Sequence, residues 1–187
     1  MLTRTLALLA TAALLGSALG ALVGWNVTLQ RVPVAVMEAI EARMVGPEGE
    51  WNTCVHERQY GPLPRVARSN PDSMVTRIAY DLSAGSLRLR GKTWPDYWSL
   101  SVYDQNTDNV FVVNDQQIEG DSFDYTLVRT TDVSVADGSQ KIVSPTRRGI
   151  LLIRRFVVSE ADVLAVHANQ DLMQCEITSS PLRRLPP

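Results

Sequence analysis

The chain has 187 residues, of which 45% are hydrophobic and 20% are charged, the composition of an ordinary globular protein. Its length favours one domain with a small additional segment. The formal net charge of −2 argues against nucleic-acid binding, which depends on clustered positive charge. Two cysteines are too few for a disulfide-rich miniprotein, and two histidines leave little for a histidine-based metal site.

Charged residues are almost absent from the start of the chain. All 20 acidic residues and all but one of the 18 basic residues lie after position 30, and the exception is Arg4. The sequence therefore divides into an apolar leader, residues 1–30, and a mildly acidic remainder.

The leader has the length and composition of a transmembrane helix. Thr5–Leu29 is a run of 25 uncharged residues, and about 20 are enough to cross a bilayer. Trp25 lies near the far end of the run, where an indole suits the membrane interface. A cleaved signal peptide is the alternative, because the small residues of Ala18–Gly20 suit a cleavage site, but the apolar run continues past them. We expect an uncleaved anchor that crosses the membrane once, with Arg4 in the cytoplasm.

Three glycines of the leader are spaced four residues apart, at Gly16, Gly20 and Gly24. On a helix they share one face, and such a face lets a second helix approach closely. The alternative is that transmembrane helices simply tolerate glycine. The spacing predicts helix packing, which would give a homo-oligomer.

Residues 31–50 predict a second, short helix and a linker. Pro33 is expected to break or kink the helix of the leader. Val36, Ile40 and Met44 then recur every four residues, with charged residues between them, which is typical of an amphipathic helix. We expect this helix to pack on the following domain or on the membrane surface, and to end at residues 46–49.

Residues 51–178 contain short segments in which apolar and polar residues alternate, as expected for strands with one buried face. Turns rich in Gly, Pro, Asp and Asn separate them. Such spacing is typical of an antiparallel β-sandwich or a jelly-roll-like barrel. We therefore predict a mainly β domain over 51–178, with one or two short helices and a flexible tail at 179–187. The predicted strands are 75–82, 86–90, 97–103, 109–113, 125–128, 140–143, 150–153 and 175–178.

One helix is predicted just before the last strand. Ser159–Asp162 resembles a capping box, with Asp in place of the usual Glu at its fourth position. The following residues provide an apolar stripe at helical spacing, formed by Ala161, Leu164, Ala165, Ala168 and Leu172.

The two cysteines, Cys54 and Cys175, lie near the two ends of the β domain. A pair of lone cysteines beyond an export segment favours a disulfide bond in an oxidising compartment. Free thiols are one alternative. The other is a metal site in which His56 and His167 complete a Cys₂His₂ set, but the spacing is not that of a zinc finger. We expect the disulfide, with no metal and no cofactor.

Candidate chemistry is sparse, and no catalytic residue is assigned. The loop from Asp104 to Asn109 superficially matches a calcium loop, although Asp and Asn also favour hairpin turns for local hydrogen-bonding reasons. Asp72, Asp81 and Asp104 could pair as acid and base, but strand ends and turns explain them as well. The residues that could form a ligand or partner surface are Asp72, Asp81, Tyr97, Tyr103, Asp104, Asp108 and Asn109.

Several short motifs occur together in a known order, namely 70–72, 81–83, 97–100 with 103–104, 107–109, 144–146, 154–155 and 160–162. As a set they resemble the bacterial domain of unknown function 1254, over roughly residues 65–175. The resemblance implies a β-rich domain of envelope proteins. It also implies that longer members continue into a companion domain of unknown function 1214, which this chain is too short to contain.

We therefore expect a single-pass protein of the bacterial inner membrane whose β domain lies in the periplasm. Its function would be that of a non-enzymatic subunit that docks a separate protein carrying the companion domain. The alternative is a periplasmic enzyme or a carbohydrate-binding module that uses carboxylates at the strand ends. An enzyme requires a pocket in which these carboxylates meet, whereas an interaction subunit requires an exposed apolar patch or strand edge.

Overall fold

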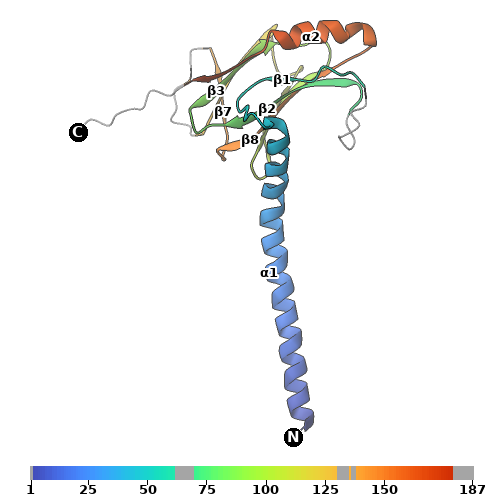
Figure 1. The fold of residues 1–187 in the computed structure, drawn as a ribbon, viewed down its shortest axis with the longest axis vertical. Coiled ribbons are helices and arrows are strands. Elements are labelled where there is room, and N and C mark those ends of the chain that lie inside the picture. The colour runs from blue at the N-terminus through green and yellow to red at the C-terminus, as the bar shows by residue number, and fades with distance from the viewer. Residues whose placement is uncertain (1, 62–69, 130–134, 136–137, 179–187) are drawn as a thin grey trace, which may run out of the picture.

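A computed structural model describes residues 2–61, 70–129, 135 and 138–178 of the chain. It consists of one long helix, α1, which leads into a β domain (Figure 1). The β domain contains two sheets, and a short helix, α2, lies at the end of the domain opposite α1.

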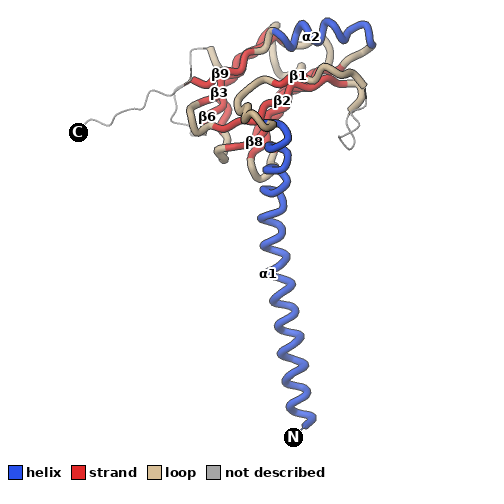
Figure 2. The backbone as a smooth tube through the Cα atoms, viewed as in Figure 1, coloured by secondary structure: helices blue, strands red, loops and turns tan. Residues whose placement is uncertain are grey.

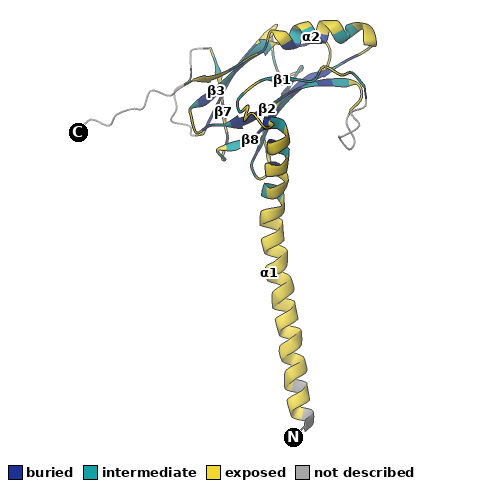
Figure 3. Cartoon of the chain, viewed as in Figure 1, coloured by how far each residue is buried: buried dark blue, intermediate teal, exposed yellow. Residues whose placement is uncertain are grey.

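Helix α1 (Leu2–Val45) is continuous over 44 residues, roughly 66 Å at 1.5 Å per residue. Its apolar part is exposed on all sides (Figure 3), and by length and composition it could cross a membrane. The helix passes through Pro33, so the predicted break at this residue is wrong. Proline removes one helical hydrogen bond, a loss that a helix held in place downstream can accommodate.

The last turns of α1 are held by the β domain. They contact strands β2 (Ser73–Asp81) and β8 (Arg148–Phe156), and they bury Met37, Glu41 and Val45. The predicted amphipathic helix is therefore the C-terminal part of α1, packed on the domain. Its predicted apolar stripe is wrong by one position, because Val36 is 47% exposed, and Ile40 and Met44 are less buried than the residues that follow them.

The domain is mainly β, as the alternation pattern predicts (Figure 2). The first sheet is entirely antiparallel, in the order β1 (Val55–His56), β2, β8, β4 (Trp98–Asp104) and β5 (Asn109–Asn114). The second sheet has the order β7 (Gln140–Val143), β6 (Ser122–Val128), β3 (Ser86–Lys92) and β9 (Gln174–Thr178), and only its β6–β7 pair is parallel. The predicted strands are all present, and the two-residue β1 is an addition.

The core lies between the two sheets, and most of it comes from the inward faces of β2, β3, β4, β6 and β8. Leu87 and Leu89 of β3 face Leu151 and Ile153 of β8 across this core, and all four are fully buried. Aromatic rings join the layers, since the ring centroids of Trp98 and Phe123 lie 5.4 Å apart. The core residues match the predicted apolar positions because the two-residue period of a strand sends alternate side chains to one face.

Helix α2 (Val163–Asp171) follows the 3₁₀ turn η1 (Glu160–Asp162). The predicted cap is present: the Asp162 carboxylate accepts hydrogen bonds from the backbone N–H of Ser159 at 3.0 Å and from its hydroxyl at 2.9 Å. The helix presents an unexpected face to the domain, however. Its buried residues are Val166 and Gln170.

The apolar stripe predicted for this helix faces outward, although such a stripe ordinarily covers a core. We call it the α2 apolar surface. Leu164 is 78% exposed and Leu172 is 59% exposed. All five of its members are exposed in the structure: Ala161, Leu164, Ala165, Ala168 and Leu172.

Candidate functional site

A disulfide bond joins Cys54 and Cys175, whose Cα atoms lie 5.7 Å apart, as the sequence predicts. Cys54 precedes β1 of the first sheet and Cys175 lies in β9 of the second sheet, so the bond ties one sheet to the other. Because both thiols are consumed, the Cys₂His₂ metal site is excluded. Among the residues that the structure describes, no group of three or more His, Cys, Asp or Glu side chains could hold a metal ion.

The predicted surface residues separate into two groups at opposite ends of the first sheet. Tyr103, Asp104, Asp108 and Asn109 belong to the β4–β5 hairpin. Asp81 ends the neighbouring β2 at the same end, beside the last turns of α1. Asp72 and Tyr97 lie at the other end, where their carbonyls accept hydrogen bonds from Val157 and Phe156 at 2.8 and 2.9 Å.

Asp104 is buried and stabilises the hairpin in which it lies. Its Oδ1 accepts hydrogen bonds from the backbone N–H groups of Asn106 at 2.8 Å and Asp108 at 3.0 Å. The turn also requires the left-handed backbone of Thr107, at φ 69°. The calcium-like spacing of this loop is therefore explained by local hydrogen bonding, which leaves Asp108 and Asn109 exposed.

Asp81 has a similar structural role at the end of β2. Its Oδ2 accepts a hydrogen bond from Arg148 Nε at 2.6 Å, and its Oδ1 accepts one from the backbone N–H of Ser83 at 2.9 Å. Burial opposes ionisation of Asp81, but the hydrogen bonds from Ser83 and Arg148 outweigh it and hold the pKa of this carboxyl below its ordinary value. A carboxylate held ionised by two partners is poorly suited to act as a general acid.

The three carboxylates proposed for acid–base chemistry do not share a pocket. Asp72 is exposed at one end of β2, Asp81 is paired with Arg148 at the other end, and Asp104 is closed inside its own turn. These positions fit strand ends and turns, the structural interpretation of the pattern.

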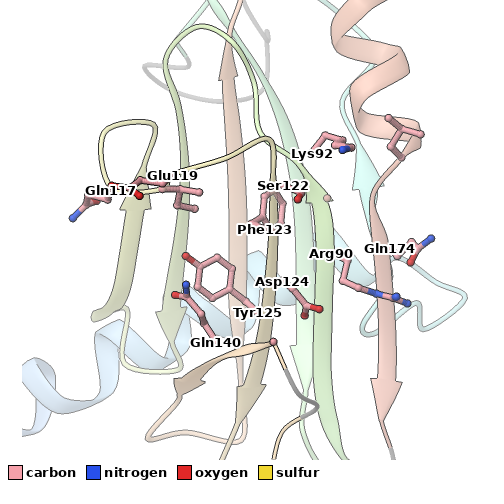
Figure 4. A pocket seen from close by; sticks show the side chains of 14 residues that line it. Arg90, Lys92, Gln117, Glu119, Ser122, Phe123, Asp124, Tyr125, Gln140 and Gln174 are labelled. Atoms are coloured by element: carbon pink, nitrogen blue, oxygen red, sulfur yellow. The ribbon is translucent and has the colours of Figure 1, made fainter.

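One open pocket of about 750 Å³ lies at the edge of the second sheet (Figure 4). Strand β7 pairs with β6 only from Tyr125 onward, so β7 leaves a notch beside residues 122–124. Tyr125 points to one side of β6, toward Gln140 and Glu119, and Asp124 points to the other side, toward Arg90 (Figure 4). None of the residues predicted to form a ligand or partner surface lines this pocket, although Leu172 of the α2 apolar surface does.

The charged groups of the pocket are largely paired with one another or with neighbours. Arg90 contacts Glu176 at 3.0 Å, Lys92 contacts Asp121 at 2.7 Å, and Asp124 contacts Arg88 at 2.5 Å. Burial raises the pKa of Tyr125, so this hydroxyl stays protonated at neutral pH. The pocket therefore offers amide and hydroxyl groups for hydrogen bonding. Two carboxylates, Glu119 and Asp124, also line it, and that of Asp124 is engaged by Arg88.

Two features of the structure are not anticipated by the sequence reasoning. One is the outward direction of the α2 apolar surface. Helical periodicity defines an apolar face, but it does not show whether that face packs on the domain or lies in solvent. The other is Arg155, which is fully buried. Its position could have been inferred, since strand alternation places Arg155 on the same face of β8 as Leu151 and Ile153.

One solved structure supports the fold, and a second is less similar. The crystal structure of the VPA0106 protein from Vibrio parahaemolyticus matches with a TM-score of 0.65 and 11% identity, over 86% of this chain and 39% of that chain. A putative uncharacterized protein from Burkholderia cenocepacia matches with a TM-score of 0.43 and 15% identity, over 65% of this chain and 34% of that chain. The chain thus spans about two fifths of the length of the first structure and about a third of the second.

No curated protein matches the chain significantly. The model of one protein family does, with the description "Protein of unknown function (DUF1254)", and it matches residues 51–176. This range contains α2 and all of the strands that the structure describes, except for the last two residues of β9. The chain therefore belongs to the DUF1254 family.

Proposed function

We propose that this chain is a membrane-anchored subunit of the bacterial cell envelope, whose β domain docks a separate protein carrying the companion domain of unknown function 1214. The uncharged part of α1 would cross the inner membrane, and the β domain would lie in the periplasm. The disulfide bond supports this compartment, because structural disulfides persist where the environment is oxidising.

The α2 apolar surface is the observation that carries the docking proposal. A short helix with its apolar stripe in solvent loses the hydrophobic stabilisation that the stripe would provide in a core. Its outward direction is explained if a partner covers it. The surface also lies at the end of the domain farthest from the start of α1 (Figure 1), where a partner would not collide with the membrane.

The length of the solved Vibrio chain suggests what covers the α2 apolar surface. The fold of this chain accounts for 39% of the solved Vibrio chain, so in that protein the same fold is accompanied by further polypeptide. The family resemblance suggests that longer members carry the companion domain in the same chain. We infer that here the companion is a separate protein that binds the α2 apolar surface.

A second copy of the chain is the competing occupant of the α2 apolar surface.

The glycine face of α1 is a separate place for self-association. Gly16, Gly20 and Gly24 have open space around them, since a Cβ atom added at any of the three would meet no atom within 4 Å. Helix pairing in the membrane through these glycines stays a prediction. It is compatible with docking of the companion at the far end of the domain.

The enzyme or carbohydrate-binding alternative has less support. It depends on carboxylates at the strand ends, and Asp72, Asp81 and Asp104 are held apart by their own structural contacts. The open pocket at the edge of the second sheet contains none of them.

Co-purification from native membranes tests the proposal. The tagged full-length chain, extracted in mild detergent, is expected to recover the companion-domain protein. Leu164→Glu places a charge in the centre of the α2 apolar surface and should reduce this recovery at least about tenfold. Val112→Glu on β5, where Val112 is 54% exposed, is the matched control and should leave recovery unchanged.

Leu164 is exposed, so its substitution should leave the melting temperature of the isolated protein unchanged, which separates lost docking from lost folding. Equal recovery of the companion by Leu164→Glu and wild type would refute the proposed surface. Recovery of only a second, differently tagged copy, abolished by Leu164→Glu, would assign the surface to self-association.

A further inference from the structure

We propose that a small oxyanion, a carboxylate or a phosphate, binds between α2 and the first sheet, with Arg155 and Gln170 as its principal donors. This site is separate from the α2 apolar surface, because it involves the opposite face of the helix. It therefore stands independently of the docking proposal.

Arg155 lies inside the sandwich, near its α2 end. Arg155 is 1% exposed and lies on the inward face of β8, the face of Leu151 and Ile153. Its partners on the neighbouring strands are Met74 of β2 and Trp98 of β4. A guanidinium carries its charge under all ordinary conditions, and a charge buried without a counterion is costly. Such a position therefore calls for a compensating group.

The neighbours of Arg155 are neutral and leave one donor unused. Its Nε donates to Asn169 Oδ1 at 2.6 Å and its Nη1 donates to Thr76 Oγ1 at 3.1 Å. Its Nη2 is buried and has no hydrogen-bond partner. Burial alone lowers the pKa of Arg155 to about 10, and no carboxylate counteracts this.

Gln170, on the next position of α2 after Asn169, supplies a second unused donor. It is completely buried, its Oε1 accepts a hydrogen bond from Arg58 Nη1 at 3.5 Å, and its Nε2 has no partner. The two unsatisfied donors thus belong to neighbouring parts of one cluster: Arg58 contacts Gln170, and Asn169, the preceding residue of α2, contacts Arg155. Unsatisfied buried donors are rare in folded proteins, and a bound oxyanion would satisfy both of these.

The surrounding charges also favour an anion. His56 Nδ1 lies 3.0 Å from Thr76 Oγ1, and burial together with the positive charges of Arg58 and Arg155 lowers the pKa of its imidazole. The nearby carboxylate of Asp171 is already engaged by Arg58. Among the described residues, therefore, two guanidinium groups face one carboxylate, and an oxyanion would balance the second.

One ion pair forms the solvent-exposed side of the cluster. The side chains of Arg58 and Asp171 are 44% and 62% exposed, and they form the outer side of the cluster next to Gln170. Displacing one surface ion pair costs little, because solvent screens it. An oxyanion could therefore reach the unused donors of Gln170 and Arg155 without unfolding of α2.

The test measures the melting temperature of the full-length protein in detergent against sodium acetate, sodium phosphate and sodium chloride at constant ionic strength. Binding predicts a saturable rise of about 5–10 °C at a hundredfold excess of acetate or phosphate over its Kd, with no such rise in chloride. Arg155→Met should raise that Kd at least about tenfold. Arg154→Met, on the opposite face of β8, is the matched control and should respond like the wild type.

A second variant keeps the proposal testable if Arg155→Met fails to fold. Gln170→Glu places a tethered carboxylate beside the guanidinium groups, so it should melt higher than wild type in chloride and respond to neither acetate nor phosphate. A wild-type response that is equal in all three salts would overturn the proposal and leave ordered water as the partner of these donors. An undiminished response in Gln170→Glu would also overturn it, by showing that the anion binds elsewhere.

Discussion

Arg88 and Asp124 form a two-contact ion pair across strands β3 and β6, on the outer face of the second sheet. Arg88 Nε and Nη2 donate to the two carboxylate oxygens of Asp124 at 3.0 and 2.5 Å. The side chains are only 23% and 25% exposed, so solvent screens this pair less than a typical surface pair. The Arg88 hydrogen bond is the main reason that the pKa of Asp124 lies below its ordinary value.

Asp124→Asn should therefore destabilise the domain by about 1 kcal/mol at pH 7. Because the folded-state pKa of Asp124 is lowered, its stabilising contribution is present above the unfolded pKa of about 3.9 and is lost as the pH falls through the folded value. Urea unfolding of both proteins at several pH values checks this. A stability difference that persists unchanged at pH 2 would show that the effect is steric, and Asp121→Asn, at an exposed pair with Lys92, should change stability less.

At the scale of elements, close approach of strands depends on glycine at one position. Gly149 of β8 pairs with Tyr80 of β2 and Asp104 of β4. A Cβ atom at this position would collide with the Tyr103 carbonyl oxygen and the Tyr80 hydroxyl. The Tyr80 hydroxyl in turn donates to that same carbonyl at 3.1 Å and contacts Ser144 Oγ at 2.9 Å. The hydrogen bonds at this end of the first sheet therefore require a residue without a side chain at position 149.

Gly149→Ala should lower the free energy of unfolding by about 2–4 kcal/mol, because a backbone oxygen cannot move aside without shifting β4. Gly91→Ala provides the comparison. Its Cβ would meet side-chain atoms only, Phe123 Cζ at 2.7 Å and Met173 Cγ at 3.2 Å, which can rotate away. Chemical denaturation should rank the two substitutions in this order, and a larger loss for Gly91→Ala would contradict the assigned role of Gly149.

The elements differ in how well their sequence predicts them. Strands such as 97–103 are predictable because alternation fixes both their type and their buried face. The continuity of α1 through Pro33 depends on tertiary contacts of Met37 and Val45, which no local pattern contains. The disulfide partners are predictable because only two cysteines exist. The outward face of α2 accompanies the burial of Val166 and Gln170 and the hydrogen bond from Arg155 to Asn169, which joins distant segments.

At the scale of the whole molecule, the proposed membrane-spanning helix and the proposed docking surface lie at opposite ends. About 40 Å of uncharged helix at the N-terminus is sufficient to cross the hydrocarbon core of a bilayer. The last turns of α1 then fasten to β2 and β8, and the sheets separate this attachment from α2 (Figure 1). The disulfide bond between Cys54 and Cys175 joins the two sheets. The α2 apolar surface would therefore be held in a fixed orientation, directed away from the membrane.

We propose that a companion protein covers the α2 apolar surface in the native cell envelope. Photo-crosslinking in intact cells, with a crosslinking amino acid in place of Leu164 or of Val112, tests it most directly. We predict that the probe at position 164 forms a crosslink to the companion-domain protein and that the probe at position 112 does not. Crosslinks at position 164 that contain only a second copy of this chain, or no crosslink at all, would contradict docking of the companion-domain protein at the α2 apolar surface.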